Sequence, residues 1–148
     1  MDLPTTPYIS LIYRYHAKFL NKEIKNVNLT YGLYPFLIGI YRNDGLSQEQ
    51  LATLFSLNES TVTRNLNKLE KLGLIKKTPL KRKKIITITD EGIDVAKSVM
   101  DCDEKWDNII KNELTEEEFL NFKKTLIKIS EGLDESNYWR FKIKKKYS

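Results

Sequence analysis

The sequence has few of the residues from which catalytic and metal sites are usually built. Its 148 residues include one histidine and one cysteine, His16 and Cys102. A single cysteine excludes an intramolecular disulfide and any cysteine-rich zinc site. The sequence also lacks a glycine-rich phosphate loop and any set of ligands at metal-binding spacing. We therefore expect no enzymatic activity and no bound cofactor or metal.

Long apolar runs are absent as well. No stretch approaches the ~18 apolar residues of a membrane span. The N-terminal segment MDLPTTPYIS lacks the basic-then-apolar pattern of a signal peptide. These absences favour a cytoplasmic protein. A hydrophobic fraction of 41% over 148 residues suits one domain, or one domain with dimerisation arms.

The charges are strongly segregated along the chain, although the formal net charge is only +5. Residues 61–89 contain nine basic residues and one acid, a balance of +8. Residues 90–121 contain three basic residues and eleven acids, a balance of −8. A concentrated basic block is the electrostatic signature of a surface that binds duplex DNA. The acidic block would repel phosphate, so we expect it to point away from DNA.

Residues 46–92 contain the most informative pattern of the chain. Ser47 and Gln50 form a capping-box pair, which predicts the start of a short helix. Asn58 is a favourable N-cap for a second helix, and Gly73 stands where that helix would end. The sequence therefore predicts two short helices joined by a tight turn.

Two β-rich runs follow this helix pair. The first begins at residues 74–75 and the second covers residues 85–89, with a lysine-rich loop between them. Two helices followed by a basic hairpin predict a winged helix-turn-helix, a mainly α fold with a small β-hairpin wing. This fold places its second helix in the major groove of DNA.

The polar side of the second helix carries side chains that can donate to phosphates and base edges. At about 100° per residue, the side opposite its apolar stripe contains Ser60, Arg64, Asn67, Lys68 and Lys71, with Thr61 and Thr63 beside it. Arginine pairs well with guanine and asparagine with adenine. A solvated helix face would also carry such residues, but it usually includes acids at i,i+4 spacing. Glu70 is the only acid of this helix after Glu59, which favours DNA recognition.

Further helices are predicted on both sides of this core. Residues 7–26 and 30–42 have apolar residues at helical spacing, and capping residues at Thr89 or Asp90 and at Thr115 begin two more helices. The apolar side of the first helix contains Ile9, Ile12, His16, Phe19 and Leu20. The terminal helices cannot easily bury their apolar faces within one chain, which favours a homodimer and a pseudo-palindromic DNA site.

These elements predict a division of the chain into three parts. Residues 1–29 form an N-terminal dimerisation helix, and residues 30–92 form the winged helix-turn-helix DNA-binding domain. Residues 93–148 form C-terminal dimerisation helices that end in a basic tail.

The sequence resembles the MarR family of transcriptional regulators from the first helix to about residue 133. The segments that carry the resemblance are Ser60-Thr61-Val62-Thr63-Arg64, Leu72-Gly73-Leu74, the wing residue Arg82, and Ile88-Thr89-Asp90-Glu91-Gly92. The resemblance implies an obligate homodimer with interlocked terminal helices and a wing arginine, Arg82, that enters the minor groove. Lys81 and Lys83 flank this arginine and are further candidates for DNA contact. Leu80 occupies the position where the family usually has an aspartate that holds the arginine, so the wing would rely more on charge.

The resemblance also implies an effector site. Family members often lose DNA affinity when a small phenolic or anionic ligand binds between the dimer helices and the winged lobe. The candidate residues here are Arg14, Tyr15, His16 and Tyr34. Each has an ordinary alternative: a histidine or tyrosine on an apolar face is more often a packing residue, and Arg14 fits a solvated face. Asp101 and Asp103 flank Cys102 and disfavour its thiolate, which argues against a redox role.

We thus expect a sequence-specific, double-stranded DNA-binding regulator, a homodimeric repressor released by a small effector. The alternative is a winged-helix module for protein–protein assembly that does not recognise an operator. The scarcity of acids on the polar side of the second helix argues against that alternative.

Overall fold

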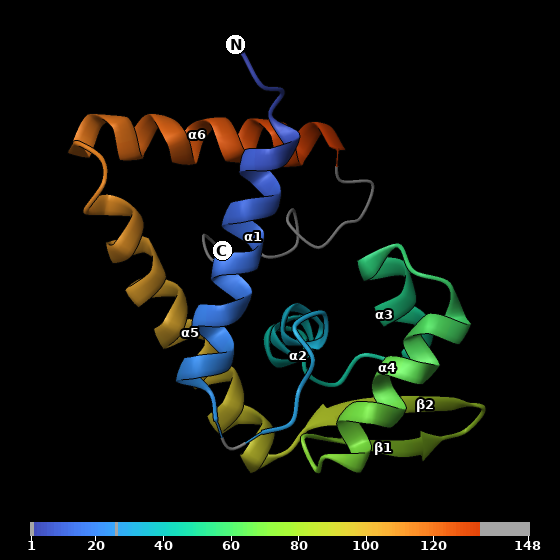
Figure 1. Ribbon diagram of the computed structural model, residues 1–148. Coiled ribbons are helices and arrows are strands. Elements are labelled where there is room, and N and C mark those ends of the chain that lie inside the picture. The colour runs from blue at the N-terminus through green and yellow to red at the C-terminus, as the bar shows by residue number, and fades with distance from the viewer. Residues whose placement is uncertain (1, 26, 134–148) are drawn as a thin grey trace.

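The computed structural model describes residues 2–25 and 27–133 of the chain, and it is mainly helical in this part. Figure 1 shows the helices and the single antiparallel hairpin. In chain order they are α1 (Thr6–Glu23), α2 (Leu33–Arg42), α3 (Gln48–Phe55), α4 (Glu59–Lys71), β1 (Ile75–Leu80), β2 (Lys83–Ile88), α5 (Asp90–Lys111) and α6 (Glu116–Leu133). The predicted winged helix-turn-helix is confirmed. The basic tail expected at the C-terminus lies outside the described residues.

The helix-turn-helix begins and turns at the capping residues that the sequence predicts. Ser47 and Gln50 cap α3 reciprocally, with backbone to side-chain distances of 2.9 and 3.2 Å. The Asn58 side chain accepts a hydrogen bond from the backbone N–H of Thr61 at 2.8 Å and so caps α4. Each cap satisfies an N–H group that has no partner inside its helix.

The second helix starts later than the sequence predicts. Helix α2 begins at Leu33 rather than at Thr30. The backbone N–H groups of Leu33 and Tyr34 donate to the carbonyl oxygens of Thr30 and Tyr31, so residues 30–33 form a tighter turn before the helix. The predicted helix at residues 7–26 is likewise shorter, because Ile24 leaves the helical conformation and ends α1.

The wing is a hairpin supported by a third short segment. Strands β1 and β2 pair antiparallel from Ile75 opposite Ile88 to Leu80 opposite Lys83. The backbone of residues 45–47 lies along the other edge of β2, where Ile86 exchanges hydrogen bonds of 2.9 and 3.0 Å with Leu46 and Gly45. The wing is therefore attached to the chain just before α3 as well as just after α4.

A shared core holds the winged lobe, residues 33–88, together. Its fully buried side chains come from four helices or strands and include Leu37, Ile40, Leu51, Val62, Leu66, Leu69 and Ile86. Val95, Ala96, Val99 and Cys102 bury the first half of α5 against this lobe. The apolar stripe of α4 is thus used for packing, which leaves its polar side exposed.

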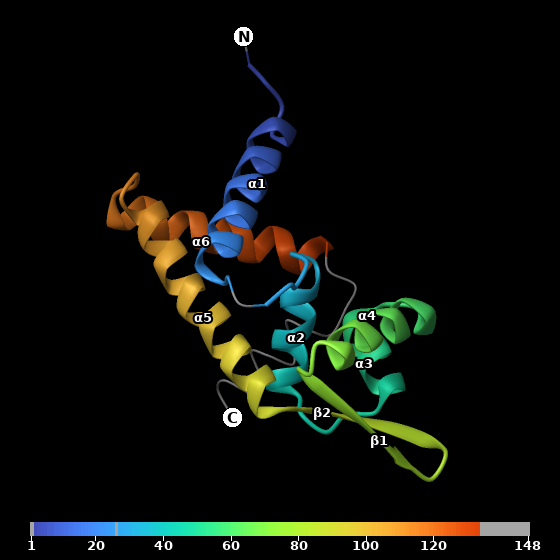
Figure 2. The same ribbon diagram turned by 60° about the horizontal axis from the view of Figure 1, so that its bottom comes forward.

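The outer helices behave differently, because much of their apolar surface is not covered within one chain. We call α1, α6 and the second half of α5 the helical arm; Figure 2 shows it at the end of the molecule opposite the hairpin. Ile9 is 63% exposed and Ile12 is 48% exposed, and α6 has no buried residue. The predicted apolar side of α1 is therefore buried only near its end, at Leu20. No helix in the described ranges is long and apolar enough to cross a bilayer.

The turn after α4 and the start of α5 pack closely against each other, and we call this contact the junction. The Thr89 hydroxyl donates to the carbonyl oxygen of Gly73 at 2.6 Å, and the Thr89 backbone N–H donates to that of Leu74 at 3.0 Å. Thr89 also caps α5 by accepting from the N–H of Gly92. A Cβ atom on Gly92 would lie 2.1 Å from the Leu74 oxygen and 2.7 Å from Cγ1 of Ile88. Only glycine allows this approach.

Gly92→Ala should therefore destabilise the protein, even though alanine is the better helix former. Relieving the overlap with Leu74 must shift the backbone, at a cost of about 1–3 kcal/mol in the free energy of unfolding. Gly132→Ala is the matched control, since a Cβ there meets nothing within 4 Å. Urea unfolding measures both variants. A Gly92→Ala variant as stable as wild type would contradict this account of the junction.

Candidate nucleic-acid interface

The exposed side of α4 brings together most of the predicted DNA-contacting residues. Ser60, Arg64, Asn67, Lys68 and Lys71 are all exposed, and Thr61 and Thr63 are half-buried. The side chains of Lys68 and Lys71 make no hydrogen bond or ion pair with any described residue. Both ammonium groups are therefore available to phosphates.

The first turn of α4 is organised around its cap. The Ser60 hydroxyl donates to Oδ1 of Asn58 at 2.8 Å, and the same oxygen accepts from the Thr61 N–H. One Nη atom of Arg64 donates to the Thr61 hydroxyl at 3.2 Å. Thr61 therefore positions the guanidinium, and the other N–H groups of Arg64 remain available to a base edge.

Thr63, a predicted DNA contact, has two protein partners in this structure. Its hydroxyl donates to the carbonyl oxygen of Glu59 at 2.8 Å and accepts from Nε2 of Gln48 at 2.6 Å. Both contacts lie within the protein, so Thr63 connects α4 to the start of α3. The residue type suggested a DNA contact, whereas the crossing of the two helices gives the hydroxyl protein partners.

Lys77 was not among the predicted site residues, but it contacts the exposed side of α4. Its ammonium donates to Oδ1 of Asn67, and its backbone N–H donates to a carboxylate oxygen of Glu70 at 3.2 Å. Glu70, the one acid of α4 after Glu59, thus holds the strand next to the helix. The lysine-rich strand was the available signal in the sequence, but nothing local indicated which lysine would reach α4.

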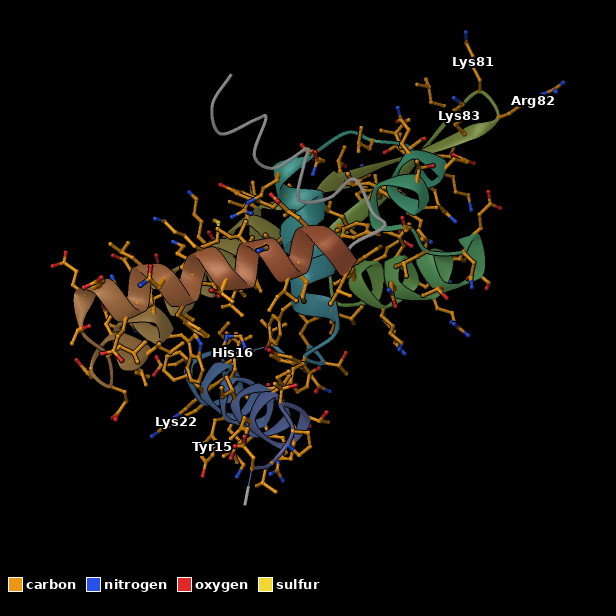
Figure 3. The ribbon with its side chains drawn as sticks, turned by 90° about the horizontal axis from the view of Figure 1, so that it is seen from above. Tyr15, His16, Lys22, Lys81, Arg82 and Lys83 are labelled. Atoms are coloured by element: carbon orange, nitrogen blue, oxygen red, sulfur yellow. The ribbon has the colours of Figure 1, made fainter. Side chains whose placement is uncertain are left out.

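The tip of the wing projects its basic residues away from the molecule. Figure 3 shows Lys81 and Arg82 pointing outward from the end of the hairpin, with Lys83 just behind them. Lys81 has a φ of +57°, so the two-residue turn between Leu80 and Lys83 places it in the left-handed region. Arg82 makes no hydrogen bond with a described residue and Leu80 is 59% exposed. The tip therefore presents charge, and among residues 2–25 and 27–133 no side chain holds the arginine.

The candidate effector residues do not meet in one place. Figure 3 shows His16 and Tyr15 on different sides of α1. Tyr15 lines an apolar groove of about 1050 Å³ between α1, α5 and α6, whereas Tyr34 lines a separate hollow of about 530 Å³ between the end of α1 and α2. Arg14 is exposed and lines neither. The structure therefore separates the four residues that the sequence grouped.

His16 belongs to an aromatic cluster between α1 and α5. The Tyr31 hydroxyl is hydrogen-bonded to Nδ1 of His16, and the His16 ring lies 4.9 Å from that of Trp106, edge to face. Burial lowers the pKa of His16, while Asp103 and Asp107 act in the opposite direction. Burial raises the pKa of Tyr31. A neutral imidazole that accepts from a protonated phenol fits both shifts.

Cys102 is buried against the winged lobe. Its pKa is raised first by burial and then by Glu23; Asp103 and Asp101 contribute less. The sequence argument named those two aspartates, but burial has the larger effect. The thiol is therefore poorly suited to act as a thiolate. Within the described residues, no group of three histidine, cysteine or carboxylate side chains could hold a metal ion.

Comparison with known proteins finds that this chain is similar to transcriptional regulators. The family model described as "MarR family" matches residues 29–84. The HTH-type transcriptional regulator BilQ of Clostridioides difficile is 31% identical over 135 residues, which cover 85% of this chain and 91% of BilQ. The BilQ protein of Clostridium symbiosum is 29% identical and covers 77% of this chain and 82% of its own length.

Solved structures resemble the chain over most of its length. A MarR crystal structure is 29% identical with a TM-score of 0.74, and the match covers 88% of this chain and 91% of the other. The S. aureus MepR–DNA complex shares the fold at 22% identity, with a TM-score of 0.75 and coverage of 90% and 100%. These structural matches cover about nine tenths of the chain, so they include the helical arm as well as the winged lobe. The family model, by contrast, ends at residue 84.

The lowered pKa of His16 gives the folded protein a pH dependence. The unfolded chain, with an ordinary histidine pKa of 6.5, binds more protons than the folded chain near pH 6. The free energy of unfolding should therefore decrease as the pH falls through about 6.5. Because the sequence has one histidine, His16→Gln should lose less stability than wild type between about pH 8 and pH 5.5. Urea unfolding at several pH values tests this, and parallel curves for the two proteins would contradict it.

Proposed function

Since this chain belongs to the MarR family of DNA-binding transcriptional regulators, we propose that it is a homodimeric repressor of a pseudo-palindromic operator. Its relatives are regulators of transcription, so its function is DNA binding rather than catalysis. The observation that carries the proposal is the exposed side of α4 together with the wing tip, where basic and amide side chains extend from the winged lobe. We also propose that the protein acts in the cytoplasm, where its bacterial relatives hold their DNA.

The DNA interface divides into base-recognising and phosphate-binding parts. Arg64 is held near the start of α4 by Thr61, and the first residues of a recognition helix are those that reach base edges. Asn67 lies about one turn after Arg64 on the same exposed side, where its amide can also meet a base edge. The long ammonium side chains of Lys68 and Lys71 suit phosphates. Lys81, Arg82 and Lys83 lie at the end of the wing, where they would contact the adjacent minor groove and backbone. The structural neighbour MepR was solved as a DNA complex.

The exposed apolar surface of the helical arm is the argument for the proposed dimer. Its exposed apolar side chains include Leu11, Ile12, Ile109, Leu120, Leu126, Ile127 and Ile129. Such a surface is large for a monomer and is typical of a protein interface. A second copy would cover it and would place two α4 helices on one side of the molecule, as a two-fold DNA site requires. We accordingly propose residues 1–29 and 93–148 as dimerisation segments around a DNA-binding domain at 30–92.

The effector part of the proposal concerns the hollow between α1 and α2. It lies where the helical arm meets the winged lobe, and its lining includes Lys25, Tyr31 and Tyr34. A phenol or an aromatic anion could hydrogen-bond to the tyrosines and pair with the lysine. One structural neighbour, 21% identical with a TM-score of 0.71, is an organohalide-sensing regulator that was solved with 2,4-dichlorophenol bound.

Arg64→Ala should weaken binding to the operator by about 1–3 kcal/mol and leave binding to random DNA mostly unchanged, because it removes a base contact. Lys68→Ala should weaken both and reduce the slope of log affinity against log salt by about one unit, because it removes a phosphate contact. Fluorescence anisotropy at several salt concentrations measures both effects. An equal loss on operator and random DNA in Arg64→Ala would contradict the base contact. No preference for any sequence in the wild type would favour an assembly module instead.

Wild-type protein should sediment at twice the chain mass of 17.4 kDa. Ile12→Glu should shift it toward the monomer, because a carboxylate in the apolar groove cannot be desolvated cheaply. Ser10→Glu is the control on the other side of α1, where the residue is exposed. Analytical ultracentrifugation at micromolar concentration gives the masses. A wild-type monomer would overturn the dimer proposal.

At least one member of a panel of phenols and benzoates should lower the affinity for DNA in a shift assay. Lys25→Met should reduce the response to the benzoates, since it removes the cation of the hollow. Lys22→Met removes the same charge from α1 outside the hollow and should respond as wild type does. The effector proposal fails if no compound changes DNA binding, and its location fails if both variants respond alike.

A further inference from the structure

We propose that Lys77 determines which base Asn67 recognises, turning an adenine-pairing side chain into one that selects guanine. This inference rests on the proposed function, since it assumes that the exposed side of α4 enters the major groove. It concerns a residue of β1 that lies beside the recognition helix.

Lys77 is attached to α4 at two points. Its backbone N–H donates to Glu70 at 3.2 Å, and its ammonium donates to Oδ1 of Asn67. Glu70 and Asn67 are three residues apart and lie on neighbouring turns of the helix. The backbone contact fixes where the Lys77 side chain leaves the strand, so the side chain extends along α4 toward Asn67.

The chemistry of the pair fixes the orientation of the amide. A lysine ammonium has three donors and no acceptor, whereas an asparagine amide has one acceptor oxygen and one NH₂ group with two donors. Lys77 can therefore contact only the oxygen of Asn67. The usual ambiguity between the two ends of an amide is removed, and Nδ2 is the atom left for another partner.

This orientation opposes the usual pairing of asparagine with adenine. That pairing needs the amide oxygen to accept from N6 of adenine while the nitrogen donates to N7. Here one lone pair of the oxygen already accepts from the Lys77 ammonium, and this cation would repel the amino group of adenine or cytosine that approached the other lone pair. Guanine presents two adjacent acceptors, N7 and O6, in the major groove. Nδ2 of Asn67 and the remaining N–H groups of Lys77 together match that edge.

The test is a binding selection from a random duplex pool with the full-length chain. Asn67→Ala identifies the position that Asn67 recognises, because the preference there should disappear. At that position wild type should select guanine, and Lys77→Met should raise the adenine-to-guanine ratio by roughly tenfold, the order of one bidentate contact. Lys77→Arg also presents only donors, so it should keep guanine.

Lys76→Met is the matched control. It removes the same charge from the neighbouring, exposed position of β1, so it should keep the guanine preference, with any loss of affinity spread evenly over sequences. Thermal unfolding of each variant establishes that it is folded before selection. Lys77→Glu provides a second folded variant if Lys77→Met unfolds, and it too should lose guanine.

The outcomes separate this inference from the proposed function. If wild type enriches no sequence, the proposed function fails and the inference fails with it. If wild type enriches a motif but Lys77→Met selects the same base as wild type, only the inference fails. Adenine at the Asn67 position in wild type, or no position that depends on Asn67, would overturn it as well.

Discussion

The contact between the start of α5 and the turn after α4 sets the relation between the two halves of the molecule. Thr89 bonds to Gly73 and Leu74, and Gly92 lies so close to Leu74 that only a hydrogen fits between them. Helix α5 has 22 residues and is therefore about 33 Å long. A small rotation at its first turn therefore displaces its far end much more than its near end. In the proposed dimer, this junction would determine how far apart the two recognition helices lie.

The sequence could predict the features that depend on near neighbours. The caps at Ser47, Asn58 and Thr89 each bond to an N–H three residues away. Such contacts form whenever the local chain becomes helical, so the residue types are enough to locate them. The charge of the α4 surface was also predictable, because helical periodicity alone separates the apolar stripe from the polar side.

The contacts between elements could not be predicted in the same way. Thr63 accepts from Gln48, and Lys77 holds Asn67 ten residues away, only because of the angles at which α3 and β1 lie against α4. Periodicity likewise identifies which side of α1 is apolar but not what covers it: Leu20 packs within the chain, whereas Ile12 is exposed. Tyr15 and His16, which were grouped from the sequence, lie on different sides of α1 because adjacent helical residues are about 100° apart.

The separation of charge along the chain has a consequence for the approach to DNA. The basic block ends at the wing, and the acidic block runs along α5 to the first turn of α6, toward the opposite end of the molecule in Figure 2. The described part of the protein is thus an electric dipole. In the field of a polyanion a dipole experiences a torque, which would turn the molecule wing first toward DNA before the proposed contact is made. Such orientation raises the fraction of productive collisions. Salt limits the effect to separations between protein and DNA of about one Debye length, roughly 8 Å at physiological ionic strength.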